Sequence, residues 1–282
     1  MTAEEKNALA RFLDCAADYL KDGYNRPRGS YAFENDTKPD NTAPPPLIDA
    51  PSASLPSSSL PLAYQIDEDD DTLEAAEPEA VMSAGYALPE AATLSELAAL
   101  VSNCSACPLA PTRKHTVPGE GAERPLVLVI GEGPGADEDA TGRPFVGNAG
   151  QLLDKMLASI GLSRTENCYI ANIVKCRPPG NRDPQPDEIA ACLPFLHQQI
   201  KLLRPKTILC AGRVAAQALL NTSRGITALR GAFTEYTPAG DAEKPIPVLC
   251  TYHPSALLHS ESYKRPAWED LKLLKARLEE RE

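Results

Sequence analysis

A long glycine-rich and carboxylate-rich segment, Gly131 to Gly150, lies between a short apolar segment and a helix-like one. The apolar segment, Leu126 to Ile130, has the composition of a buried strand, and the helix-like segment runs from Gln151 to Leu157. Glycine lets a backbone approach a ligand closely, and the free N–H groups at a helix start attract anions. Phe145 adds an aromatic surface for stacking. The pattern indicates a ligand-binding loop at a strand end.

Strand-like and helix-like segments alternate through the rest of the chain. Strands are expected at 126–130, 169–174, 207–211 and 247–251, helices at about 149–160, 187–203, 213–220 and 265–280, and a hairpin near 233–236. This alternation predicts an α/β fold with a mainly parallel sheet covered by helices on both faces. Ligands bind at the carboxyl ends of the strands in such a sheet. The polar residues expected at those ends are Glu132, Asn172, Arg213 and His253.

The first third of the chain has a different composition. Residues 1–24 carry apolar positions at helical spacing and a stop at Gly23, which predicts a short amphipathic helix. Residues 25–91 are rich in Pro, Ser and Ala and contain an acidic run, which predicts a disordered linker. The folded domain is expected over 92–282. The helix either docks onto a protein partner or the domain itself, or it binds nothing.

The net charge of −11 belongs to the first hundred residues, and the remainder of the chain is close to neutral with local basic clusters. The acidic composition is therefore no argument against DNA binding. The chain has no run of 18 apolar residues, and its N-terminus lacks a basic region followed by an apolar stretch. These features predict a cytoplasmic protein without a membrane span.

Four of the eight cysteines have the spacing of metal ligands. Cys104 and Cys107 form a Cys-x2-Cys pair, and Cys176 and Cys192 flank the proline-rich loop 177–184. Two close thiolates hold one edge of a metal centre, and two from a distant segment complete four ligands. The wide spacing of Cys176 and Cys192 favours an iron–sulfur cluster over zinc, for which two tight pairs are usual.

The alternative for Cys176 and Cys192 is burial as small apolar side chains. Cys210 and Cys250 lie inside apolar strand segments, where we expect core residues. The other two cysteines, Cys15 and Cys168, have no matched partner and are left out of the metal site.

Four motifs together carry a family resemblance. They are Cys104-x2-Cys107-Pro-Leu, the loop from Gly131 through Gly-Arg-Pro-Phe-Val-Gly-Asn-Ala-Gly, Asn172-Ile-Val-Lys-Cys-Arg-Pro-Pro, and Tyr252-His-Pro-Ser-Ala256. In this order, over roughly 93–280, they resemble the iron–sulfur uracil-DNA glycosylases, family 4 of that superfamily. One such motif would be weak support, whereas four in register are specific.

The resemblance implies a three-layer α/β/α fold and an enzyme that hydrolyses the N-glycosidic bond of uracil in DNA. It also implies a 4Fe-4S cluster, with Cys104, Cys107, Cys176 and Cys192 as ligands. The partner is then uracil-containing DNA, and we expect a monomer. Residues 1–91 lie outside the resemblance.

Uracil in a duplex must be flipped into a pocket, where stacking and hydrogen bonds offset the cost of unstacking. Phe145 is the candidate stacking platform, although a core phenylalanine is the plainer alternative. Asn172 can pair with N3–H and O4 of uracil, and cytosine presents the opposite pattern there. Glu138 is implied by the resemblance to exclude the thymine methyl group, and its alternative is a solvated loop carboxylate. Gly133 lies in the uracil-binding loop where better known uracil glycosylases place an aspartate.

Bond cleavage leaves negative charge on the base and positive charge on the sugar. His253 is the expected donor to uracil O2. Glu132 is expected to position the attacking water, either with its side chain or with its backbone while the side chain supports the loop. The absence of an aspartate at Gly133 predicts catalysis mainly by stabilising the leaving group. Three residues are expected to contact DNA, with solvated surface side chains as the alternative for the two basic ones: Ser255, Lys175 and Arg177.

Two rival functions remain at this point. A glycosylase with broader specificity for deaminated bases would share the cysteines and the His-Pro-Ser motif, but Glu132 favours the uracil-specific branch. A non-catalytic iron–sulfur DNA-binding module would bind without releasing any base, and changes at His253 or Asn172 would then be silent.

Overall fold

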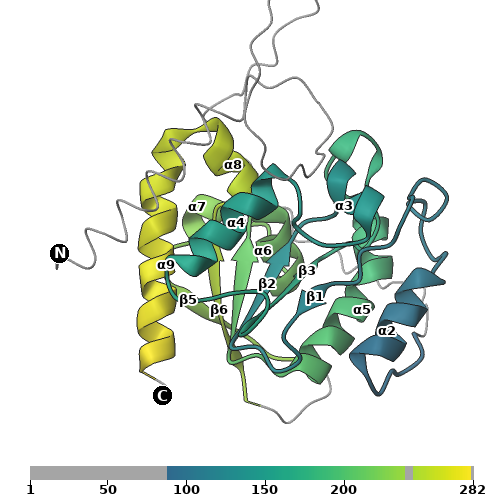
Figure 1. Cartoon of the computed structure of the whole chain (residues 1–282), viewed down its shortest axis with the longest axis horizontal. Coiled ribbons are helices and arrows are strands. Elements are labelled where there is room, and N and C mark those ends of the chain that lie inside the picture. Colours follow the sequence, from purple (N-terminus) through teal and green to yellow (C-terminus); the bar gives the residue numbers. More distant parts are fainter. Residues whose placement is uncertain (1–87, 239–243, 281–282) are drawn as a thin grey trace, which may run out of the picture. The chain divides into compact units, whose positions relative to one another are not determined.

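Six strands form one sheet in the computed structural model, which describes residues 88–238 and 244–280 (Figure 1). Their order across the sheet is β1-β3-β2-β4-β6-β5. Their bounds are β1 (Glu120–Gly121), β2 (Val127–Gly131), β3 (Cys168–Asn172), β4 (Thr207–Ala211), β5 (Phe233–Tyr236) and β6 (Ile246–Thr251). The four central strands are parallel, and β1 and β5 pair antiparallel at the edges. The predicted, mainly parallel sheet is confirmed.

The helices of the described residues alternate with the strands along the chain. They are α2 (Leu94–Ser102), α3 (Ala136–Thr141), α4 (Asn148–Ala158), α5 (Pro186–Leu203), α6 (Arg213–Leu220), α7 (Ile226–Leu229), α8 (Pro254–His259) and α9 (Lys264–Glu279). The helices expected between residues 149 and 280 are all present, with their ends within two residues of the predicted ones. The sequence pattern does not predict α3, α7 and α8, because a helix of four to six residues shows less than two turns of periodicity.

Alternate residues of the central strands point into two separate cores. Leu128 and Ile130 of β2 pack with the buried residues of α2, α5 and α6. Val127 and Val129 of the same strand pack with α4, α8 and α9 on the other face. Figure 1 accordingly shows α9 and α2 on opposite sides of the sheet. The fold is the three-layer α/β/α sandwich that the family resemblance implied.

Contacts with the rest of the folded domain begin slightly before the predicted boundary at residue 92. Ala91 is buried, and its N–H donates to Gln198 Oε1 of α5 over 3.0 Å. The Gln198 amide in turn donates to the Pro89 carbonyl over 2.9 Å. The predicted helix at 1–24 and residues 25–87 of the predicted linker lie outside the described residues, so these boundaries stay predictions.

None of the helices described is both long and apolar enough to cross a membrane.

Candidate active site and cysteine pocket

A pocket of about 350 Å3 lies at the carboxyl ends of the parallel strands. This volume is in the range of small-molecule sites, which usually measure roughly 300–1,000 Å3. The segments that follow β2, β4 and β6 and the last residue of β3 form its walls. It brings together the expected site residues Glu132, Gly133, Glu138, Phe145, Asn172, His253 and Ser255.

Asn172, the last residue of β3, offers the pocket a buried acceptor. Its side chain is 1% exposed, and Oδ1 has no hydrogen-bond partner among the described residues. An unsatisfied buried polar atom costs about 1–3 kcal/mol, so a ligand N–H at this point would recover that free energy. Gly131 makes the space, because a Cβ there would lie 2.5 Å from Asn172 Oδ1 and from Phe145 Cζ.

Phe145 belongs to the core cluster on the α4 and α9 face of the sheet and also forms a wall of the pocket beside this acceptor. The ring is 6% exposed and lines the pocket. Its centroid lies 5.6 Å from that of the His253 ring, and the two planes are inclined by 36°. The stacking surface and the candidate donor therefore face one space.

Glu138 holds the loop together through hydrogen bonds to the backbone. Its Oε1 accepts the N–H groups of Val146 and Gly147 over 2.8 and 2.9 Å. Its Oε2 accepts the Gly135 N–H over 3.1 Å. The alternative of a freely solvated carboxylate does not describe this side chain. Its position in the pocket wall leaves the proposed exclusion of thymine open to experiment.

His253 is a neutral ring in this site. It is the N-cap residue of α8, two residues after the end of β6, and accepts the Ser255 backbone N–H at Nδ1 over 3.2 Å. Desolvation lowers its pKa to about 4, and the Glu138 carboxylate opposes this shift. The Ser255 hydroxyl also lies 2.7 Å from Nδ1. Ser255 therefore orients the His253 ring through its backbone N–H and its hydroxyl group. Its contact with DNA stays a prediction.

Glu132 directly follows β2, and the pKa of its side chain lies close to neutrality. Burial and, to a lesser extent, the nearby Asp183 carboxylate raise its pKa to about 7, and the Arg213 guanidinium opposes the shift. Arg213 is ion-paired with Asp183. A carboxyl with a pKa close to neutrality can accept a proton from water at physiological pH.

Gly133 occupies a position with no room for a side chain. A Cβ there would lie 2.8 Å from Val174 Cγ2 and 3.6 Å from Pro178 Cδ. An aspartate at this position would require those residues to move. Glu132 is therefore the carboxylate that the β2 end supplies to the pocket.

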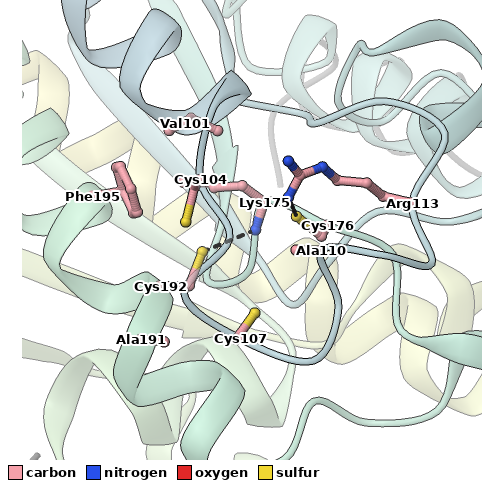
Figure 2. Close-up of a pocket in the computed structure, with 10 residues that line it drawn as sticks. All are labelled: Val101, Cys104, Cys107, Ala110, Arg113, Lys175, Cys176, Ala191, Cys192 and Phe195. Atoms are coloured by element: carbon pink, nitrogen blue, oxygen red, sulfur yellow. Dashed lines mark hydrogen bonds between the residues drawn. The ribbon is translucent and has the colours of Figure 1, made fainter. Parts of the chain in front are cut away.

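The four expected metal ligands line a second pocket, between α2 and α5 (Figure 2). Cys104 and Cys107 follow α2, Cys176 follows β3, and Cys192 lies on α5. Figure 2 shows the four side chains directed into a common space. The two cysteine pairs, at least 69 positions apart in the sequence, thus meet at one place, as the spacing predicted.

The sulfur atoms in this pocket accept hydrogen bonds. Arg113 donates to Cys176 Sγ over 3.4 Å, and the Lys175 backbone N–H donates to Cys192 Sγ over 3.2 Å (Figure 2). Burial raises the pKa of the Cys192 thiol to about 12, so a thiolate there requires compensating positive charge. In the described chain, no group of three or more His, Cys, Asp and Glu side chains is placed to hold a metal ion.

Cys210 and Cys250 are confirmed as core residues. They are neighbours on β4 and β6, and neither side chain has any exposed surface.

The prediction that Lys175 contacts DNA phosphate is wrong. The residue is 1% exposed, and its ammonium donates to the Asn172 carbonyl over 2.7 Å and to Gln199 Oε1 over 2.6 Å. Burial lowers its pKa to about 8. The basic segment around Cys176 suggested a surface, but α5 covers the lysine. Lys175 instead connects the cysteine pocket to the strand end that carries Asn172.

The contact of Arg177 with DNA stays a prediction. Its side chain is partly exposed and donates to Asn181 Oδ1 over 2.7 Å. Asn181, Arg182 and Arg213 line the active-site pocket. The loop after Cys176 therefore runs from the cysteine pocket to the rim of the active site.

The sequence did not point to two arginines whose side chains donate hydrogen bonds to residues of these pockets. Arg113 contacts a cysteine ligand candidate, and Arg164 donates to the backbone of Phe145. Neither lies in a motif, and both act on residues at least 19 positions away. A single sequence contains no local signal for such contacts.

The comparison with known families agrees with this geometry. The sequence model of the uracil DNA glycosylase superfamily matches residues 118–272, which include the whole active-site loop and the His253 segment. The chain therefore belongs to the uracil-DNA glycosylase superfamily.

Individual relatives narrow the comparison to one branch. The chain is 41% identical to the type-4 uracil-DNA glycosylase of Archaeoglobus fulgidus over 64% of this chain and 90% of the relative. It is also 41% identical to the type-4 enzyme of Pyrobaculum aerophilum, over 63% of this chain and 91% of the relative. The type-5 uracil-DNA glycosylase of Pyrobaculum aerophilum is less similar, at 31% identity over 55% of this chain and 79% of the relative. The chain is thus more similar to these two type-4 proteins than to this type-5 protein.

Proposed function

We propose that this protein is a uracil-DNA glycosylase that hydrolyses the bond between a flipped uracil and its deoxyribose. The product is an abasic site in the DNA. The observation that carries the proposal is the buried, unpaired Oδ1 of Asn172 beside Phe145 in a pocket at the strand ends. The similarity to curated type-4 uracil-DNA glycosylases supports the same activity.

Asn172 supplies the selectivity for uracil. Its Oδ1 accepts N3–H of the base, and its amide group donates to O4. Cytosine carries an unprotonated N3 and an amino group at these positions. Oδ1 would then face another acceptor, and the amide group would face another donor. A site built around a buried hydrogen bond rejects the wrong base strongly, because the protein atom is left unpaired.

His253 and Glu132 divide the chemical step. As the bond between C1′ and N1 breaks, its electron pair passes to uracil, whose O2 receives a hydrogen bond from His253 Nε2–H. The sugar carbon gains positive charge and takes up water, and the Glu132 carboxylate accepts the proton that this water loses. The neutral state of His253 suits donation to a uracil anion, since Nδ1 is already occupied as an acceptor.

The four cysteines fit a 4Fe-4S cluster held by Cys104, Cys107, Cys176 and Cys192. They come from two distant segments into one pocket, and N–H donors already point at two sulfur atoms. When bound, the cluster supplies a covalent cross-link between these segments and the positive iron charge that thiolates require. The chain itself transfers no electron in the glycosidic reaction. Arg177 follows the third ligand and contacts the phosphate backbone near the flipped nucleotide.

The direct test uses a labelled oligonucleotide with one uracil and alkali cleavage of the abasic product. The wild-type protein is expected to release uracil, and Asn172→Asp is expected to release it at least about a hundredfold more slowly, because a carboxylate cannot donate to O4. Parallel substrates with cytosine, hypoxanthine or mismatched thymine test specificity. Release of hypoxanthine as fast as uracil would favour the broader deaminated-base glycosylase. Binding without release of any base would favour the non-catalytic DNA-binding module.

A further inference from the structure

The conformation of Phe145 requires support from its surroundings. Its φ is 52°, which lies in the left-handed region that bulky side chains rarely adopt. Such a backbone persists only where neighbouring groups fix it. The same conformation turns the ring beside Asn172 and His253, so whatever holds the backbone also holds the stacking surface.

The Arg164 side chain donates hydrogen bonds to the backbone of Phe145 and of the residue before it. Its Nη1 donates to the Pro144 carbonyl and its Nη2 to the Phe145 carbonyl, each over 2.8 Å. The arginine side chain is only 11% exposed, so water competes little for these carbonyls. A planar guanidinium can bind two successive carbonyl oxygens at once, which a lysine ammonium does less well.

A carboxylate from α4, the helix between Phe145 and Arg164, orients Arg164. Asp154 of α4 accepts from its Nε over 2.9 Å and pairs with its Nη2 over 2.8 Å. Glu120 of β1 lies 3.9 Å from Nη1. With these partners the guanidinium has a fixed plane before any substrate binds.

The opposite side of the loop is held independently. The Glu138 carboxylate binds the N–H groups of Val146 and Gly147, which directly follow Phe145. The carbonyl of Phe145 packs against Gly150, where a Cβ would overlap it. Arg164 is therefore the side chain that fixes the carbonyl side of the platform, and Glu138 fixes the N–H side.

We propose that Arg164 is a positioning residue that sets the uracil-stacking platform through the Pro144 and Phe145 carbonyls. This inference rests on the proposed function for its kinetic part. Without the two hydrogen bonds, Phe145 relaxes toward an ordinary backbone conformation and the ring leaves its place beside Asn172. The flipped uracil then loses part of its stacking energy.

The kinetic test compares Arg164→Ala, Arg164→Lys and wild type on the uracil oligonucleotide. We expect kcat/KM to fall about tenfold in Arg164→Ala, the equivalent of part of a base–aromatic stack. The rise in KM should exceed the fall in kcat, because stacking already binds the flipped base before the bond breaks. Arg164→Lys should recover part of the loss. Arg124→Ala is the matched control, since this exposed arginine also donates to a backbone carbonyl but precedes β2, at the far end of the sheet.

A double-mutant cycle with Phe145→Leu separates positioning from a general effect on folding. If Arg164 acts through the ring, Arg164→Ala should cost less than about twofold in the Phe145→Leu background. An equal loss in both backgrounds would overturn the proposal.

A second measurement is independent of enzymatic activity. Amide hydrogen exchange in peptides covering 143–150 should become faster in Arg164→Ala than in Arg124→Ala at matched distance from each melting temperature. Unchanged exchange there would overturn the positioning role even if the wild type released no uracil. Inactive wild type with the expected change in exchange would instead contradict the proposed function alone.

Discussion

His253 Nδ1 accepts the backbone N–H of Ser255 over 3.2 Å. A backbone N–H can only donate, so the proton of the neutral imidazole lies on Nε2. With its pKa lowered to about 4 by desolvation, the ring stays neutral at physiological pH. The main chain of Ser255 therefore decides which ring nitrogen donates into the pocket.

This relationship predicts unequal effects at the two residues. His253→Ala should lower kcat by about a hundredfold or more, because it removes a donor to the departing base. Ser255→Ala should cost about tenfold or less, since the backbone N–H that fixes the tautomer remains. Single-turnover release of uracil measures both values. Equal losses would show that the Ser255 hydroxyl, and not its main chain, controls the histidine.

The pH profile should report Glu132. Its pKa of about 7 means that the water-accepting carboxylate form increases through neutrality, so kcat/KM should rise with an apparent pKa close to 7. Glu132→Gln should be slow at every pH and should lack this rise. The measurement is uracil release between pH 5 and 9 at constant ionic strength. A rise of the same midpoint in Glu132→Gln would assign the titration to another group.

The raised pKa of the Glu132 carboxyl also predicts how the free energy of unfolding changes with pH. The folded state retains the Glu132 proton up to about pH 7, whereas the unfolded chain releases it near the ordinary value of 4.5. The free energy of unfolding therefore decreases as pH rises through this window. Glu132→Gln removes the penalty, so its melting temperature should exceed that of wild type at pH 8 and approach it at pH 5. An equal difference at both pH values would contradict the raised pKa.

Iron content tests the cysteine pocket. Cys192→Ala should lose bound iron together with thermal stability, because one of four ligands is missing. Cys168→Ala is the matched control, since that cysteine is also buried but packs in the core on the other face of the sheet. Iron analysis and visible absorption of the purified full-length proteins measure the difference. Full iron in a stable Cys192→Ala protein would show that another residue completes the site.

The salt dependence of DNA binding separates the two basic residues near Cys176. Arg177→Gln should reduce the slope of log affinity against log salt by about 0.9, the value for one lost phosphate contact on duplex DNA. Lys175→Met should leave the slope unchanged and lower stability, because its ammonium binds Asn172 and Gln199 in the interior. Titration of abasic-site DNA at several salt concentrations provides the measurement. A reduced slope in Lys175→Met would restore the original expectation of a phosphate contact.

The strands and long helices could be predicted from the sequence because their signals are local. The segment 207–211 is apolar after Thr207, and the helix at 213–220 repeats its apolar positions every three to four residues. The short helix α3 gave no such signal, since half of its residues, Ala136 to Thr141, are acidic and its N-cap is a glycine. Its geometry depends on Glu138 reaching back to the Gly135 N–H.

The sequence by itself determined which residues could take part in the chemistry. The motifs around Phe145, Asn172 and His253, together with four cysteines at metal-ligand spacing, were sufficient to indicate both pockets. Residue type and order carry that information, because the chemistry of each side chain is intrinsic.

Only the tertiary structure decided what each of these side chains contacts. Lys175 looks like a surface cation in the sequence, but Gln199, 24 residues later, accepts a hydrogen bond from its ammonium in the interior. Arg164 has no motif, yet it fixes the backbone of Phe145. Burial, proton affinity and hydrogen-bond partners depend on segments far apart in the chain, and these meet only when the sheet has formed.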